Sequence, residues 1–245
     1  IYNALNQLPE VPARNPDGSF GMQTENMYGT YFSNPLSDLI QNENYSRSTQ
    51  VYVNAFADIK LWKGLVFRTE YAANYNYNTG YRFTPSYDYE FFKQQSSASR
   101  SAGNGSNWTL KTYLTYNGTF GKHNVSVMAG HEAQENNWES LDGSRTNFLF
   151  NSVHELNAGD ATTAKANSSR GSSAIESYFG RLNYNFADRY LLTATLRADG
   201  SSSFAKESRW GWFPSVALAW KVNNEAFLKD VEAINSLKLR LGWGV

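Results

Sequence analysis

The chain reads Tyr-Phe-Gly-Arg-Leu-Asn-Tyr-Asn-Phe over residues 178–186 and, after a short turn, Tyr-Leu-Leu-Thr-Ala-Thr-Leu-Arg-Ala-Asp over residues 190–199. Apolar and polar residues alternate with a period of two, which is typical of β-strands whose two faces meet different environments. One face carries Leu182, Leu192 and Leu196 and is continuously apolar, while the other is mostly polar. The pattern predicts two strands joined by a tight turn.

Six further stretches alternate in the same way, and each can supply the roughly 9 to 11 residues that a tilted transmembrane strand needs. The longest apolar runs, such as residues 216–220, are about five or six residues, far below the roughly 20 of a spanning helix. The sequence therefore predicts about eight strands, and any crossing of a membrane would be made by strands. The further stretches are residues 51–59, 65–77, 108–120, 125–135, 212–222 and 237–245.

The predicted connections alternate between short and long. Residues 60–64, 121–123 and 187–189 form tight turns, whereas residues 78–107 and 137–173 are rich in Asn, Ser, Gly and Tyr and are about 30 residues or longer. Compact soluble domains rarely hold such loops, but bacterial outer-membrane barrels have short periplasmic turns and long extracellular loops. We therefore predict an all-β fold, an antiparallel transmembrane β-barrel segment with long extracellular loops.

Two regions follow from this topology. Residues 1–47 are predicted to be an extracellular segment that leads into the barrel, and residues 48–245 to form part of the barrel wall. The apolar face of each strand should contact outer-membrane lipid, with aromatic residues near the strand ends as interfacial girdles. The polar face should line the lumen, and its candidate charged residues are Arg181, Arg197, Asp199, Lys221, Lys238 and Arg240.

Composition excludes several classes of function. The chain has 22 basic and 22 acidic residues, so it has no basic field that would attract nucleic acid. It contains no Cys, which removes thiol catalysis and thiolate metal sites. His123, His131 and His154 show no spacing typical of a catalytic triad, and the Asp and Glu residues complete no calcium-loop pattern. We expect no enzyme activity, no metal and no cofactor.

Three ordered motifs resemble one family. They are Arg197-Ala-Asp-Gly-Ser-Ser-Ser-Phe204, Arg209-Trp-Gly-Trp-Phe-Pro-Ser-Val-Ala-Leu-Ala-Trp220 and Leu237-Lys-Leu-Arg-Leu-Gly-Trp-Gly244. Together they resemble the barrel of SusC/RagA TonB-linked outer-membrane proteins, in which a strand ending in Arg-x-Asp-Gly-Ser-Ser-x-Phe precedes Arg-x-Gly-x-Phe-Pro-Ser. The chain departs from that pattern at the tryptophans beside Gly211 and in the loops. The resemblance covers nearly the whole chain.

The resemblance implies a larger protein than this chain. Relatives form barrels of about 22 strands with a plugged lumen, so the chain is expected to be an internal fragment without the plug, the TonB-contacting N-terminal region or the closing strands. It implies location in the bacterial outer membrane and import of oligosaccharides or peptides. The implied partners are a SusD-like surface lipoprotein and the TonB complex.

Substrate or partner contacts are expected in the long loop near residues 75–92. Sugars present apolar faces between hydroxyl groups, so aromatic platforms mixed with charged groups suit them. An alternative is that these aromatics only pack the loop or meet the lipoprotein. The candidates are Tyr77, Tyr81, Arg82, Tyr87, Asp88, Tyr89 and Phe91.

Two other readings of the pattern stay open. About eight strands is a number that can close, so the chain could be a small outer-membrane barrel that serves as a structural anchor or adhesin. The same alternation could also build a soluble sandwich with aromatics in its core. The missing export signal at residues 1–10 and the strand that ends the chain at Val245 favour the internal fragment.

Overall fold

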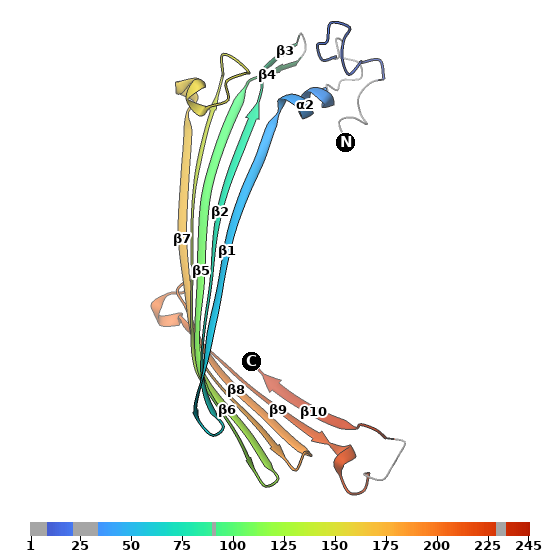
Figure 1. The fold of residues 1–245 in the computed structure, drawn as a ribbon, viewed down its shortest axis with the longest axis vertical. Helices are drawn as coiled ribbons and strands as arrows, with labels where there is room; N and C mark the ends of the chain where they lie inside the picture. Colours follow the sequence, from blue (N-terminus) through green and yellow to red (C-terminus); the bar gives the residue numbers. More distant parts are fainter. Residues whose placement is uncertain (1–8, 22–33, 90–91, 229–233) are drawn as a thin grey trace. The chain divides into compact units, whose positions relative to one another are not determined.

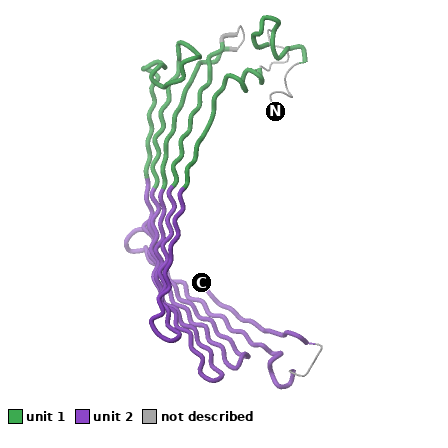
Figure 2. Tube along the Cα trace, viewed as in Figure 1, with its two compact units in different colours: residues 1–50, 76–105, 138–170 green, residues 51–75, 106–137, 171–245 purple. Residues whose placement is uncertain are grey.

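The structure is a computed structural model that describes residues 9–21, 34–89, 92–228 and 234–245. The chain divides into two compact units, which Figure 2 distinguishes by colour. Unit 1 contains residues 1–50, 76–105 and 138–170, and unit 2 contains residues 51–75, 106–137 and 171–245. Within the described residues, no helix has both the length and the hydrophobicity to cross a membrane.

One sheet of eight strands dominates the fold, in the order β1-β2-β5-β6-β7-β8-β9-β10 (Figure 1). The order of these strands in the sheet is therefore their order in the sequence. All eight expected strands are confirmed, and the registers of β7–β8, β8–β9 and β9–β10 are antiparallel. The strands are β1 (Glu43–Trp62), β2 (Leu65–Thr84), β5 (Ser97–Phe120), β6 (His123–Thr146), β7 (Lys165–Phe186), β8 (Tyr190–Ser201), β9 (Trp210–Lys221) and β10 (Lys238–Gly244).

The predicted extent of the two long loops was wrong. Strand β2 continues to Thr84 and β5 begins at Ser97, so residues 85–96 connect them. Residues 147–164 likewise connect β6 and β7. The Asn, Ser and Gly residues in these stretches led to the prediction of loops. A strand with water on both faces needs no apolar residues, however, because its hydrogen bonds are made by the main chain.

Short elements occupy the connections. Strand β3 (Tyr87–Tyr89) pairs with β4 (Phe92–Gln94) in a separate two-stranded sheet. The 3-10 helices are η2 (Leu156–Ala158), η3 (Ala161–Thr163), η4 (Lys206–Ser208) and η5 (Val222–Asn224).

The helix α2 (Pro35–Gln41) precedes β1, and Pro35 is favourable in its first turn. It is capped by Asn34, whose side chain accepts hydrogen bonds from the backbone N–H groups of Leu36 and Ser37. Strand β1 begins at Glu43, before the predicted start of the barrel region.

Glycines with positive φ form two of the tight turns. Gly64 has φ of 81° between β1 and β2, and Gly121 has φ of 60° between β5 and β6. The third turn, between β7 and β8, uses Ala187 and Asp188 at φ of 56° and 54°. All three predicted turns are confirmed, and glycine at two of them removes the cost of the left-handed conformation.

Replacing these two glycines should separate backbone strain from steric overlap. A Cβ at Gly121 would meet nothing within 4 Å. Gly121→Ala should therefore lower stability only by the strain of the left-handed conformation, about 1 to 2 kcal/mol. A Cβ at Gly64 would overlap the carbonyl oxygen of Asn117, whose N–H donates to the Gly64 carbonyl at 2.8 Å. Gly64→Ala should therefore lower the thermal unfolding temperature of the protein further than Gly121→Ala. Equal shifts would contradict the close approach of β2 and β5.

Few side chains are buried in the described part of the chain, because the eight strands form a single sheet. The buried hydrophobic cluster of unit 1 consists of Tyr81, Phe83, Ala98 and Phe148, with Leu156 and Ala158 packed against it. The sheet order runs from β1 to β10 with no pairing between these two strands in the described residues. This open sheet does not support the alternative of a small closed barrel.

Candidate functional site

The six charged residues predicted to line the lumen share one face of the sheet. Residues directly opposite in an antiparallel pair lie on the same face. The register places Arg181 opposite Thr195, which shares its face of β8 with Arg197 and Asp199. It also places Lys238 opposite Lys221, and Arg240 opposite Ala219. Their common face is settled, and its assignment to the lumen remains a prediction.

The opposite face is apolar and exposed. Leu196, Leu218 and Leu239 alternate with the charged residues, and they are 46%, 52% and 56% exposed. Such a large apolar surface on a sheet calls for an apolar environment.

Aromatic residues border this apolar face at both ends. At the end near the tight turns, Tyr190 stacks on Trp220 with ring centroids 6.4 Å apart. At the other end, Tyr178 lies 5.9 Å from Trp210, which pairs with Gly200. The ten steps from Tyr190 to Gly200 rise about 33 Å along the strand, which a tilt of about 40° reduces to roughly 25 Å. That is about the height of the apolar band of an outer-membrane barrel.

Ion pairs cross the polar face of unit 2 from strand to strand. Arg68 on β2 contacts Asp58 on β1 at 3.4 Å and Glu70 at 2.5 Å. Tyr113 on β5 donates its hydroxyl hydrogen to Glu70 at 3.2 Å. The Nζ atom of Lys111 on the same strand lies 2.9 Å from Glu132 on β6.

The ion pairs continue onto β8. Arg197 lies 3.5 Å from Glu132 and 2.7 Å from Asp199, and it donates to the hydroxyl of Ser177 on β7 at 2.9 Å. The side chain of Glu132 is only 15% exposed, so two cations compensate a mostly buried carboxylate. We call this set the charged ladder; it consists of Asp58, Arg68, Glu70, Lys111, Glu132, Arg197 and Asp199.

A depression of about 430 Å³ opens over the charged ladder. Tyr113 and Phe179 line it with ring centroids 6.4 Å apart, so aromatic surface lies among the charges. Arg181 also lines it and, among the described residues, forms no ion pair with a carboxylate. This arrangement can bind a polar molecule that has an apolar face and an anionic or hydrogen-bond-accepting group.

Charged contacts also fasten the end of the sheet near the tight turns. Lys221 donates to Asp188 at 2.6 Å, and this bond lowers the pKa of the aspartate. Glu225 accepts hydrogen bonds from the Trp220 indole at 2.9 Å and from Arg189 at 2.7 Å. These bonds, that of Trp220 first, hold the pKa of Glu225 below its usual value. Both carboxylates stay ionised at neutral pH and bind the connections to the strands.

The predicted loop candidates do not form one loop. Tyr77, Tyr81 and Arg82 lie on β2, so their expected place in a loop was wrong. Tyr77 is 43% exposed and Arg82 is exposed, which leaves both able to touch a ligand or partner.

The other loop candidates belong to the β3–β4 connection. Tyr87 is buried, and its hydroxyl accepts a hydrogen bond from Ser37 of α2 at 3.2 Å. The backbones of Asp88 and Tyr89 belong to β3, and Phe91 lies outside the described residues. Their contact with substrate or partner remains a prediction.

Tyr81 packs inside unit 1. It is 4% exposed, its ring lies 5.1 Å from that of Tyr45, and the guanidinium of Arg100 lies 4.5 Å above it. Its hydroxyl is buried without a hydrogen-bond partner among the described residues.

Removing the Tyr81 hydroxyl should therefore stabilise the barrel. An unsatisfied buried polar group costs about 1 to 3 kcal/mol, so Tyr81→Phe should raise the thermal unfolding temperature of the full-length protein. Tyr77→Phe is the matched control, because its exposed hydroxyl is solvated, and it should change little. Loss of ligand or partner binding in Tyr81→Phe would contradict a purely packing role.

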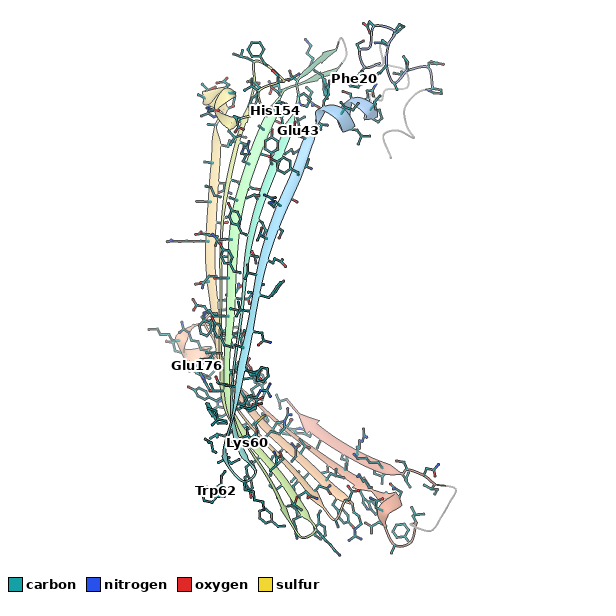
Figure 3. All side chains as sticks on the ribbon, in the orientation of Figure 1. Phe20, Glu43, Lys60, Trp62, His154 and Glu176 are labelled. Carbon is teal, nitrogen blue, oxygen red and sulfur yellow. The ribbon has the colours of Figure 1, made fainter. Side chains whose placement is uncertain are left out.

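Sequence analysis missed the residues that hold the 147–164 connection in place. His154 stacks on Phe83 with centroids 4.0 Å apart, and its Nδ1 atom lies 3.3 Å from Glu43, which Figure 3 labels beside it. Glu155 accepts from Arg100 at 2.9 Å. Phe148 anchors the other end against Phe83. The apolar run at 148–150 inside a polar stretch was the available signal. No cluster of metal-ligating residues occurs in the part of the chain that the structure describes.

An antiparallel sheet with an apolar face between two aromatic girdles and a charged opposite face is a segment of the wall of an outer-membrane β-barrel. A family model described as TonB dependent receptor-like, beta-barrel matches residues 3–245. The chain belongs to this family, and it is a protein of the bacterial outer membrane.

Similar proteins agree with this assignment. TonB-dependent receptor P3 of Formosa agariphila is 31% identical over 245 residues, which is all of this chain and 24% of that protein. TonB-dependent receptor SusC of Bacteroides thetaiotaomicron is 40% identical over 142 residues, 57% of this chain and 14% of SusC. A structure of the RagAB peptide transporter matches with a TM-score of 0.83 at 21% identity, over 93% of this chain and 26% of that one. The chain thus spans about a quarter of P3, and the match to RagAB supports the fold.

Proposed function

We propose that the chain forms part of the barrel wall of a TonB-dependent importer that takes up oligosaccharides or peptides together with a SusD-like surface lipoprotein. The TonB complex would act on a region outside this chain. The observation that carries the proposal is the charged ladder, on the face opposite an apolar, girdled surface. Family membership and the likeness to SusC support it.

The polar face suits a lumen through which hydrated solutes pass. The charged ladder has three cations and four anions, and its contacts bring opposite charges together. The face therefore offers hydrogen bonds to a solute without a strongly positive or negative electrostatic potential. Arg181 and the rings of Tyr113 and Phe179 remain available in the depression. A sugar ring or peptide could stack there and donate or accept hydrogen bonds in passing.

The tight turns are proposed to face the periplasm and the 85–96 and 147–164 connections the outside. The second of these connections is held by packing and ion pairs, yet it leaves Leu149 and Phe150 87% and 67% exposed. With Tyr77 and Arg82, these residues are the proposed contacts for substrate or for the lipoprotein.

An uptake assay in the native bacterium tests this function. Strains that carry the full-length protein are given labelled oligosaccharide and oligopeptide mixtures, with and without functional TonB. Deleting the gene or TonB should abolish uptake of one mixture, and Arg181→Ala should reduce it several-fold at an unchanged surface level. Lys122→Ala, in a tight turn, is the control and should not reduce uptake. Normal uptake of both mixtures after deletion, with loss of adhesion instead, would support the anchor alternative.

A further inference from the structure

A groove of about 560 Å³ lies on the apolar face of unit 2. Its floor consists of the small residues Ala129, Gly180 and Ala198, and its walls include the rings of Tyr178, Trp210 and Trp212. The register explains the groove, since Ala198 stands directly between Tyr178 on β7 and Trp212 on β9. Ala198 is only 4% exposed between these neighbours. Small side chains thus leave a hollow that is bordered by aromatic rings.

The position of the groove identifies its surroundings. It lies on the lipid-facing surface, at the girdle of Tyr178 and Trp210 and at the end of the strands opposite the tight turns. With those turns in the periplasm, as proposed above, the groove is in the outer leaflet. An empty apolar hollow forfeits dispersion contacts, so a hydrocarbon chain of the bilayer is its natural occupant.

Cations lie at the same end of the strands. The 202–209 connection carries Lys206, which is exposed, and Arg209, which directly precedes Trp210. The Nε atom of Arg209 donates to the Phe204 carbonyl at 3.1 Å, and among the described residues its terminal nitrogens form no ion pair with a carboxylate. Glu207 lies between these cations in sequence, so the connection keeps a net charge of +1.

The acidic group nearest the girdle is already paired. Glu176 accepts a hydrogen bond from the Tyr178 hydroxyl at 2.9 Å and lies 3.1 Å from the Nε2 atom of His131. Figure 3 labels Glu176 on β7. The carboxylate is therefore engaged by protein groups and, among the described residues, pairs with neither cation of the 202–209 connection, so these two cations can meet an anionic headgroup.

We propose that the groove binds one acyl chain of a lipid A glycolipid of the outer leaflet, and that Lys206 and Arg209 contact its phosphate. A hydrocarbon chain suits an apolar groove between rings, and the phosphate of such a lipid lies close to its acyl chains. Basic side chains beside a membrane surface bind lipid phosphates in this way. This proposal rests on the lipid-facing surface and on the proposed orientation of the strands. It does not depend on the import function.

Filling the groove tests the acyl-chain site. A Cβ at Gly180 would meet only the Met128 carbonyl oxygen at 3.7 Å, so Gly180→Leu can project into the hollow without disturbing the sheet. Titration of the detergent-purified full-length barrel with lipid A should raise its unfolding temperature. Gly180→Leu should weaken the apparent affinity by about tenfold. Ala194→Leu, on the same face but outside the groove, is the control and should bind as the wild type does.

Two further arms identify the lipid. The wild type should prefer lipid A over dephosphorylated lipid A, and Lys206→Ala/Arg209→Ala should remove that preference. Phosphatidylglycerol should bind more weakly than lipid A; equal binding would overturn the assignment to an outer-leaflet glycolipid. If Gly180→Leu misfolds, Ala129→Leu fills the same floor. Unchanged lipid A affinity in the folded groove variant would overturn the site, whereas failed uptake with intact lipid binding would count against the import function alone.

Discussion

Leu239→Arg should lower the stability of the full-length barrel by about 2 to 4 kcal/mol, while Arg240→Leu should cost far less. An arginine on the lipid face near mid-membrane is that unfavourable, but a lumen residue keeps its contact with water. Leu239 and Arg240 are adjacent on β10 and point to opposite faces. Leu196→Arg repeats the test of the lipid face on β8, where Arg197→Leu is no control because it would also remove an ion-pair partner of the mostly buried Glu132. Folding yield and thermal unfolding temperature are the measurements, and equal losses in Leu239→Arg and Arg240→Leu would contradict the face assignment.

A second measurement distinguishes a membrane surface from a soluble core, because arginine at Leu196 would disturb either. Brominated lipids should quench the fluorescence of Trp220 in the reconstituted protein, since only a lipid-facing ring meets the bromine atoms. Comparison with Trp220→Phe isolates this contribution from the other tryptophans. No quenching from Trp220 in an intact barrel would remove the membrane assignment of the apolar face.

Reversing one charge of the charged ladder should produce the second large effect. Glu132→Lys would place a third cation beside Lys111 and Arg197, which lie 2.9 and 3.5 Å from the carboxylate. Breaking a mostly buried pair costs about 3 to 5 kcal/mol, and water in the lumen should keep the loss near the lower value. The yield of folded barrel and its unfolding temperature should both fall.

A charge swap and a surface control make this result specific. Lys111→Glu combined with Glu132→Lys restores one opposite pair and should recover part of the loss, which gives the coupling energy by a double-mutant cycle. Glu207→Lys, in the exposed 202–209 connection, should change stability little. If the double variant is as unstable as the sum of the single variants, the two residues do not interact across β5 and β6.

Alternation of residues predicted much of this fold because each strand has two different environments. The eight strands and the common face of Arg181, Arg197 and Arg240 follow from a period of two. The tight turns followed from their short length and from glycine at residues 64 and 121. The family motifs indicated the membrane. Alternation alone could not do so, because the strands of soluble sheets alternate in the same way.

The remainder depends on register, which alternation does not determine. The contact between Glu132 and Arg197 joins residues from β6 and β8 across an intervening strand. A sequence pattern gives the face of each residue but not its height on the sheet. The burial of Tyr81 was likewise hidden, because it depends on Tyr45, Phe148 and Arg100 from distant parts of the chain.

The match between sheet order and chain order has a consequence for assembly. Every strand of the large sheet pairs with its predecessor, so each hairpin can form as soon as its second strand is available, and loop closure costs little entropy. In the described part of the chain, β1 and β10 each have one backbone edge without a strand partner, and such an edge can pair with a further strand. The wall can therefore form by addition of successive hairpins in the order in which they occur in the chain.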